Sequence, residues 1–370
     1  MTSTTASRDI SGILLYCRAG FEKECCDELS GILDALTGIV FELAAETGSG
    51  FVLATFRQPS DLSRLARVRL EHLIFARQLL FVFAQLTELP DRDRLTPVAG
   101  LLQAAGRRFR DLQLETPDTN DGKTLSAFCR RFTPLLASTM AAAGLLAESD
   151  ETAPRLHVFF PAQQRCLLAL GLPGNCCDWP MGVPRLRMPG DAPSRSTLKL
   201  AEAFMVLLTP EQRDTLLRPG LNAVDLGAAP GGWTWQLASR GIRVTAVDNG
   251  PLKGSVAQDP LVQHLRVDGF KYRPRRPVDW LVCDMVEQPA KVTQLISQWL
   301  CQGWARNVLF NLKLPMKKRL QEVNKCLALL AEQLHVAGFR SQIRARQLYH
   351  DREEVTVLVT TSQHKRRSVP

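Results

Sequence analysis

Two side chains of this sequence are expected to act together on a hydroxyl group. Lys313 lies near the end of the apolar run "NVLFNLKLP", and Asp284 ends the run "DWLVCDM". We expect both runs to be neighbouring parallel strands, whose ends converge on a ligand crevice. A sugar hydroxyl is weakly acidic at neutral pH, so its reaction as a nucleophile needs a general base. The sequence therefore predicts that Lys313 is this base and that Asp284 lies beside it.

A second lysine and a second acid complete the predicted group. Lys199 is in "SRSTLKLAEAF", an expected helix, and Glu354 begins the last expected strand. Lys313 must be neutral to act as a base, and the charge of Lys199 would lower the Lys313 pKa. Two carboxylates balance the two cations in a site that is partly shielded from water. We therefore predict a Lys199–Asp284–Lys313–Glu354 tetrad that polarises a hydroxyl without a metal ion.

A glycine turn, "DLGAAPGGW", is expected between a strand and a helix. A pyrophosphate-binding turn needs the pattern G-x-G-x-x-G with a free glycine amide at its second glycine. Here Pro230 offers no N–H group, and Asp225 adds negative charge. S-adenosylmethionine contains adenosine and no phosphate, so the turn favours this ligand. A dinucleotide-dependent oxidoreductase is the first alternative.

Two acids beyond the turn are candidate ligands of an adenosine. Asp248 ends the second expected strand, where it would accept both ribose hydroxyls, although NAD enzymes use the same device. Asp268 ends the third expected strand at the same edge and could accept the adenine amino group. A turn-forming role before Gly269 explains Asp268 equally well.

The motifs that this sequence lacks reduce the number of possible methyl acceptors. Enzymes that methylate exocyclic base nitrogens place Asn or Asp before Pro-Pro-aromatic, whereas Asp284 is followed by "MVEQP". Cytosine C5 enzymes commonly need a Pro-Cys pair, which the sequence does not contain, and Cys283 is better interpreted as a buried strand residue. An oxygen acceptor is favoured, and a base or small-molecule methyltransferase stays an alternative.

The elements that must position these residues divide the chain into three parts. Residues 191–370 alternate strand-like and helical runs, which predicts a doubly wound, mainly parallel sheet that ends in a hairpin. Residues 171–190 are rich in proline and glycine, which predicts a linker. Residues 1–170 are expected to form an α+β region, with a helix that runs into a strand over residues 61–81 and a helix over residues 124–146.

Composition points to a polyanionic partner. The 370 residues carry a formal net charge of +9, with basic runs at 273–276, 316–319 and 364–368. Three further basic residues recur at a spacing that puts them on one side of a helix: Lys123, Arg130 and Arg131. This face is either a phosphate-binding surface or simply a solvated one. The cysteines lack metal-ligand spacing, and no apolar run is long enough to span a membrane. We expect a cytoplasmic protein without a metal site or a membrane partner.

Several motifs resemble those of known enzymes. The segments "DLGAAPGGWT", "NLKLPMKK" and "YHDREEVTV" resemble the ribosomal RNA 2′-O-ribose methyltransferases that have a Lys-Asp-Lys-Glu tetrad. More narrowly, "CRAGFEKEC", "DTNDGKTLSAFCRRFTPLL", "DAPSRSTLKLAEAF" and "CDMVEQPAKV" resemble the RlmM family, and this resemblance spans nearly the whole chain.

The RlmM resemblance implies a class I (Rossmann-like) S-adenosylmethionine methyltransferase sheet behind an N-terminal THUMP-containing RNA-binding region. The implied substrate is the ribose 2′-hydroxyl of a cytidine in the peptidyl-transferase region of bacterial 23S ribosomal RNA, which excludes DNA. Lys313 would accept the proton. The implied cofactor contacts are Ser196, Ala229, Pro230, Gly231, Gly232, Asp248, Asp268 and Asp284. The sequence departs from the family pattern at Ala229, where cysteine is expected. An RNA-binding protein with a degenerate methyltransferase fold is the remaining alternative.

Overall fold

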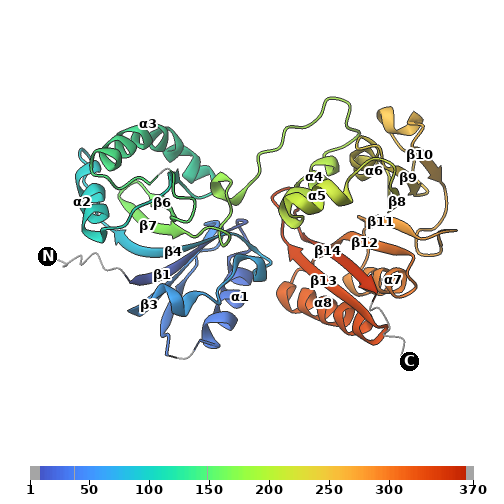
Figure 1. The fold of residues 1–370 in the computed structure, drawn as a ribbon, viewed down its shortest axis with the longest axis horizontal. Coiled ribbons are helices and arrows are strands. Elements are labelled where there is room, and N and C mark those ends of the chain that lie inside the picture. The colour runs from blue at the N-terminus through green and yellow to red at the C-terminus, as the bar shows by residue number, and fades with distance from the viewer. Residues whose placement is uncertain (1–8, 37, 148, 364–370) are drawn as a thin grey trace. The chain divides into compact units, whose positions relative to one another are not determined.

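The chain divides into two compact units, Met1–Val183 and Pro184–Pro370. The computed structural model describes residues 9–36, 38–147 and 149–363 (Figure 1). The predicted basic run at 364–368 lies outside these residues. The division falls inside the predicted linker, residues 171–190, but the first part of that segment is packed in the first unit. There the Asn175 side chain accepts from Leu70 N at 2.8 Å and donates to Val68 O at 2.9 Å.

The first unit contains one seven-stranded sheet in the order β2-β3-β1-β4-β7-β6-β5. Its strands pair antiparallel except β5 and β6, which are parallel. The strands are β1 (Ile10–Cys17), β2 (Phe41–Ala44), β3 (Phe51–Ser60), β4 (Ala76–Leu86), β5 (Leu112–Glu115), β6 (Arg155–Ala162) and β7 (Arg165–Gly171). The α-helices are α1 (Glu22–Asp34), α2 (Leu95–Ala105) and α3 (Asn120–Ala142). Thr119 caps α3 by accepting from Gly122 N.

The prediction of a helix before β4 is wrong. Residues 61–75 form only two short 3₁₀ turns, Leu62–Leu65 and Leu70–His72. Side chains from other elements bind the backbone here, since Glu28 of α1 accepts from Ile74 N at 2.7 Å and from Phe75 N at 2.9 Å. These long-range hydrogen bonds replace the i to i−4 bonds that a helix would need.

The second unit contains a seven-stranded sheet in the order β10-β9-β8-β11-β12-β14-β13. Strands β8 to β12 pair parallel, and β14 pairs antiparallel with both β12 and β13. The strands are β8 (Asn222–Leu226), β9 (Arg243–Val247), β10 (Val262–Leu265), β11 (Val278–Cys283), β12 (Ala305–Lys313), β13 (Phe339–Arg346) and β14 (Glu354–Gln363). The mainly parallel sheet with a terminal hairpin is therefore confirmed. The connection between β13 and β14 spans residues 347–353.

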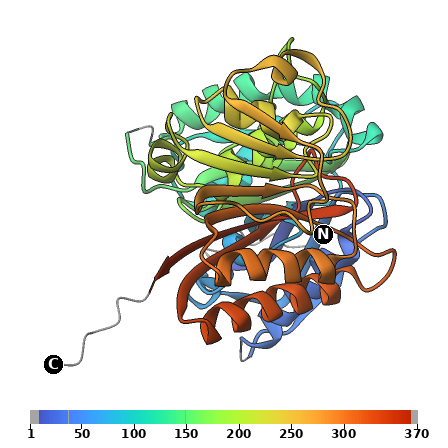
Figure 2. The same cartoon turned by 90° about the vertical axis from the view of Figure 1, so that its right-hand side faces the viewer.

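Helices cover both faces of the second sheet (Figure 2). They are α4 (Ser196–Leu207), α5 (Pro210–Leu216), α6 (Gly232–Ala238), α7 (Pro289–Cys301) and α8 (Arg319–Val336). On one face α4 packs beside α6, where the rings of Phe204 and Trp280 meet at 5.8 Å between centroids. On the other face α7 and α8 lie side by side, and α7 buries an apolar stripe at helical spacing, which includes Val292, Ile296 and Trp299. No helix among the described residues is long and apolar enough to cross a bilayer.

Candidate functional site

The structure brings the four predicted tetrad residues together. Lys313 Nζ donates to Asp284 Oδ1 at 2.5 Å and to Glu354 Oε2. Lys199 Nζ donates to Glu354 Oε1 and lies 3.7 Å from Asp284 Oδ2. Each lysine thus contacts both acids, in a group whose side chains are at most 23% exposed.

Strand register explains why these residues meet. Asp284 directly follows β11, Lys313 ends the neighbouring β12, and Glu354 begins β14 directly opposite Lys313. The carboxyl ends of parallel strands share one edge of the sheet, and β14 enters the sheet from that edge because it is antiparallel.

Lys199 reaches the same edge from α4, and a residue that the sequence analysis missed holds α4 there. The Glu202 carboxylate, three residues along the helix, accepts from Tyr349 N at 2.7 Å and from His350 N at 2.9 Å. These bonds fasten α4 to the β13–β14 connection. The spacing of Lys199 and Glu202 on one helix face is the signal that would have identified Glu202.

The two acids of the tetrad raise the pKa of Lys313, whereas the sequence predicted a lowered pKa. Burial lowers the pKa of Lys313, but the charges of Asp284 and Glu354 and their hydrogen bonds outweigh it, so the pKa is raised. Burial raises the pKa of Glu354, but the charges of Lys313 and Lys199 lower it by more, so the pKa of Glu354 is lowered overall. The prediction that the pKa of Lys313 is lowered is therefore wrong for the tetrad as it stands. Both carboxylates accept hydrogen bonds directly from Lys313 Nζ.

The predicted cofactor residues around the glycine turn lie close together. Asp248 Oδ2 accepts from Ala229 N at 3.0 Å, and Asp248 Oδ1 accepts from Gly250 N at 2.7 Å. Pro230 follows Ala229 in the turn, and Gly231 has a φ of 111°, which favours glycine. Asp248, which directly follows β9, therefore shapes the turn.

Ser196 lies against the start of α6. A Cβ atom added to Gly232 would be 2.2 Å from Ser196 Oγ, so only glycine fits there. The expected helix is present as α4, and no side chain caps its start. Ser194 Oγ and Ser196 Oγ bond each other at 2.7 Å. The Ser196 hydroxyl thus remains at the turn.

Asp268 adopts the turn geometry that was its alternative explanation. It comes three residues after β10 rather than at the strand end, and its Oδ1 accepts from Phe270 N at 2.9 Å. Its side chain is 48% exposed. An adenine contact by Asp268 stays a prediction.

The residues at the turn suit a positively charged ligand such as S-adenosylmethionine, which carries a sulfonium and an ammonium group. Asp225 is buried and accepts from Thr234 Oγ1 at 2.6 Å, while its Oδ1 has no partner within the described residues. Burial raises the pKa of Asp225 to about 7, and the charges of Asp284 and Asp248 add to the rise against the Thr234 bond. A cation would relieve this excess of negative charge. Ser196, Asp248 and the turn would hold the cofactor.

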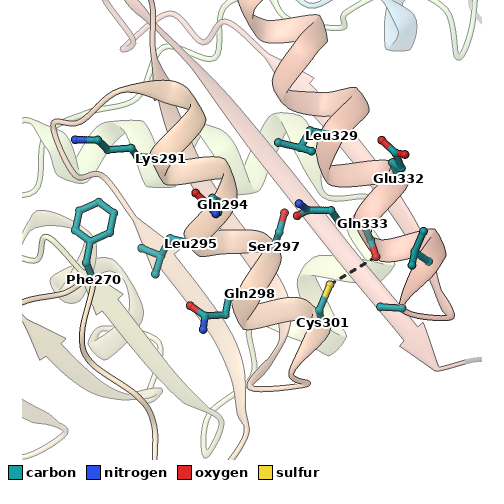
Figure 3. A pocket seen from close by; sticks show the side chains of 12 residues that line it. Phe270, Lys291, Gln294, Leu295, Ser297, Gln298, Cys301, Leu329, Glu332 and Gln333 are labelled. Atoms are coloured by element: carbon teal, nitrogen blue, oxygen red, sulfur yellow. Dashed lines mark hydrogen bonds between the residues drawn. The ribbon is translucent and has the colours of Figure 1, made fainter.

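A separate cavity lies elsewhere in the second unit. It has a volume of about 870 Å³ and lies between α7 and α8, lined by Leu295, Cys301 and Gln333 among others (Figure 3). Cys301 Sγ donates to Gln333 O across it at 3.7 Å. None of the predicted site residues lines this cavity, so it is not the candidate site.

Comparison with known proteins identifies three matching regions. Residues 10–80 match the RlmM ferredoxin-like domain, residues 93–172 match the N-terminal region of ribosomal RNA large subunit methyltransferase M, and residues 192–354 match the FtsJ-like methyltransferase family. The chain is 51% identical to ribosomal RNA large subunit methyltransferase M of Azoarcus sp. (strain BH72), over 96% of this chain and 97% of that protein. It is also 51% identical to the protein of the same name from Thauera aminoaromatica, over 95% and 96%. The chain therefore belongs to the ribosomal RNA large subunit methyltransferase M family and is an S-adenosylmethionine-dependent methyltransferase.

Proposed function

We propose that this enzyme transfers a methyl group from S-adenosylmethionine to the ribose 2′-hydroxyl of a cytidine in the peptidyl-transferase region of 23S ribosomal RNA. The observation that carries the proposal is the meeting of Lys199, Lys313, Asp284 and Glu354 at one sheet edge. Both relatives described above are named as methyltransferases of large-subunit ribosomal RNA, which supports the choice of substrate.

In this proposal Lys313 is the general base. Asp284 and Glu354 hold its amine in place, and because they raise its pKa the amine must first lose a proton. The hold of Asp284 on that proton weakens once its charge is shared with a cationic donor. Lys313 can then accept the proton of the 2′-hydroxyl, while Lys199 keeps Glu354 charge-paired. S-adenosylmethionine supplies the methyl group.

The loops beyond the tetrad fit a nucleic-acid acceptor. Val286, two residues after Asp284, is 89% exposed, and Met316, three residues after Lys313, is 94% exposed. Lys317 is exposed next to Met316. Apolar side chains can contact base faces and a lysine can contact phosphate, so these loops support RNA as the substrate.

We further propose that residues 1–170 form a THUMP-like RNA-binding region. Exposed basic residues on α3 support this role: Lys123, Arg130 and Arg131. Single-stranded and folded RNA is read by shape and by splayed bases, which suits a basic face combined with a separate catalytic unit.

Methyl transfer to unmodified 23S ribosomal RNA tests the proposal. With tritium-labelled S-adenosylmethionine, we expect label at one cytidine and resistance to alkaline cleavage at the linkage that follows it. Label on a base, or a linkage that alkali still cleaves, would reject ribose methylation.

Two alternatives are less consistent with the site. A degenerate methyltransferase fold that only binds RNA would not need the complete tetrad, whose four members are in contact. Cytosine C5 methylation needs a thiolate, but Cys283 is fully buried as predicted, and burial raises its pKa to about 12.

A further inference from the structure

A row of buried polar side chains leads from Asp284 into the interior of the second unit. Asn311 Nδ2 donates to Asp284 Oδ1 at 2.9 Å. Thr356 Oγ1 lies 2.8 Å from Asn311 Oδ1 and 2.9 Å from Asp351 Oδ2. Asn311 and Thr356 are directly opposite each other in the β12–β14 pairing, and all three side chains of the row are 0% exposed. The row therefore connects Asp351 to a member of the tetrad.

One arrangement of protons satisfies every contact in this row. Asp284 is held by two lysines and acts as an acceptor, so Asn311 must present its NH₂ group to Asp284 and its oxygen to Thr356. The Thr356 hydroxyl has a single proton, which must go to the Asn311 oxygen. The Thr356 oxygen must then accept a proton from Asp351. A carboxyl group can donate only when it is protonated.

The surroundings of Asp351 favour the same neutral state. Its Oδ2 accepts from Leu348 N at 3.0 Å, and its Oδ1 is buried without a partner among the described residues. A bare carboxylate oxygen in the interior is unfavourable, whereas a neutral acid tolerates it better. Burial and the nearby charge of Glu354 raise the pKa of Asp351 well above its usual range, against the bond from Leu348, the charge of Lys199 and the contact with Thr356.

We propose that Asp351 is a neutral carboxylic acid which, through Thr356 and Asn311, positions Asp284 against the two catalytic lysines. Asp351 is a positioning residue, since it acts through its neighbours. The inference rests on the proposed function, because its effect is exerted on the tetrad. Without the Thr356 proton, the Asn311 amide is no longer held in one orientation, and Asp284 loses the bond that fixes its Oδ1 beside Lys313.

Infrared spectroscopy tests the protonation state without reference to activity. We expect the difference spectrum between the wild-type enzyme and Asp351→Asn, recorded at neutral pH, to contain the C=O stretch of a protonated carboxyl group that the variant lacks. A difference spectrum with only carboxylate bands would overturn the proposal. Either result stands whether or not Lys313 is the base.

Replacement of Thr356 tests the positioning role. Thr356→Val removes the hydroxyl at nearly constant volume, and we expect kcat to fall about tenfold with an unchanged Kd for S-adenosylmethionine. Thr356→Ser keeps the hydroxyl and should restore kcat. Thr361→Val is the matched control, because Thr361 on the same strand donates to Arg306 O at 3.0 Å, away from the tetrad. Wild-type turnover by Thr356→Val, or an equal loss in Thr361→Val, would show that the row does not position Asp284.

Discussion

Lys313 and Glu354 are direct partners in the β12–β14 pairing, the last residue of one strand opposite the first residue of the other. Their contact is therefore set by strand register, and a shift of β14 by one residue would turn Glu354 to the other face of the sheet. The remaining members, Lys199 and Asp284, come from a helix and from a strand end. A fixed backbone pair thus carries the proposed base and the acid that holds it.

We expect Lys313→Ala to lower methyl transfer by about 10²–10⁴-fold, because a general base contributes about that factor. The Kd for S-adenosylmethionine should stay nearly unchanged, since Lys313 acts on the acceptor. Tritium transfer under single-turnover conditions and calorimetry measure the two quantities. Lys325→Ala, which changes an exposed lysine of α8, is the control and should behave as wild type. Equal turnover by both variants would remove Lys313 from the mechanism.

The rate of methyl transfer should rise with pH above neutrality. The pKa of Lys313 is raised by Asp284 and Glu354 against the effect of burial, so the neutral amine is scarce at pH 7 and its population grows as the pH increases. The residual activity of Lys313→Ala should not show this rise. A profile of kcat against pH checks both statements, and a flat wild-type profile would contradict the role of a titrating lysine.

Much of this site could be predicted from the sequence, because strand ends are marked by apolar runs that stop at a polar residue. Asp248, Asp284 and Lys313 follow this pattern, and Glu354 stands where the last apolar run begins. Prediction from the local sequence pattern failed where distant side chains decide the conformation. At residues 61–75 the Glu28 carboxylate accepts hydrogen bonds from two backbone N–H groups. Such prediction also failed for the pKa of Lys313, because the direction depends on distances between residues far apart in the chain.

The buried row shows a second limit of sequence reasoning. Asn311 lies in the motif "NLKLPMKK" and Thr356 in "YHDREEVTV", but both are uncharged strand residues, and neither motif marks them as a pair. Their significance comes from pairing across β12 and β14, which periodicity along one strand does not reveal.

We expect Asp248→Ala to weaken S-adenosylmethionine binding by about tenfold or more, since charge-assisted hydrogen bonds contribute about 1.5–3 kcal/mol. The loss has two sources, the ribose contact proposed for Asp248 and the bonds that its carboxylate accepts from Ala229 N and Gly250 N. Calorimetric titration measures the change. Asp214→Ala, an exposed acid of α5, should leave the Kd unchanged. An unaltered Kd for Asp248→Ala would refute its assignment.

Replacement of Asp225 should alter how stability depends on pH. The pKa of Asp225 is raised to about 7, so the folded state keeps its proton to higher pH than the unfolded state does. The stability that this proton contributes is present below the unfolded pKa and is lost as the pH rises through about 7. From pH 5 to pH 8 we expect Asp225→Asn to gain about 3 kcal/mol relative to wild type in the free energy of unfolding.

Urea unfolding at both pH values, without cofactor, measures the effect of Asp225→Asn. Asp214→Asn serves as the control, because Asp214 is exposed and should follow the wild-type curve. Parallel curves for wild type and Asp225→Asn would show that Asp225 is already ionised at pH 5.

The exposed side chain of Met316 should contribute to RNA binding rather than to folding. Met316 is 94% exposed on the loop that follows Lys313, so its replacement by serine removes little buried surface. If this loop contacts a base of the substrate, Met316→Ser should raise KM for a 23S ribosomal RNA fragment about fivefold, since stacking contacts contribute about 1–3 kcal/mol per base. The Kd for S-adenosylmethionine and the melting temperature should not change. Val336→Ser is the matched control, because Val336 is 80% exposed at the opposite end of α8 from this loop. A KM that changes equally in both variants, or in neither, would place the RNA away from the β12–α8 loop.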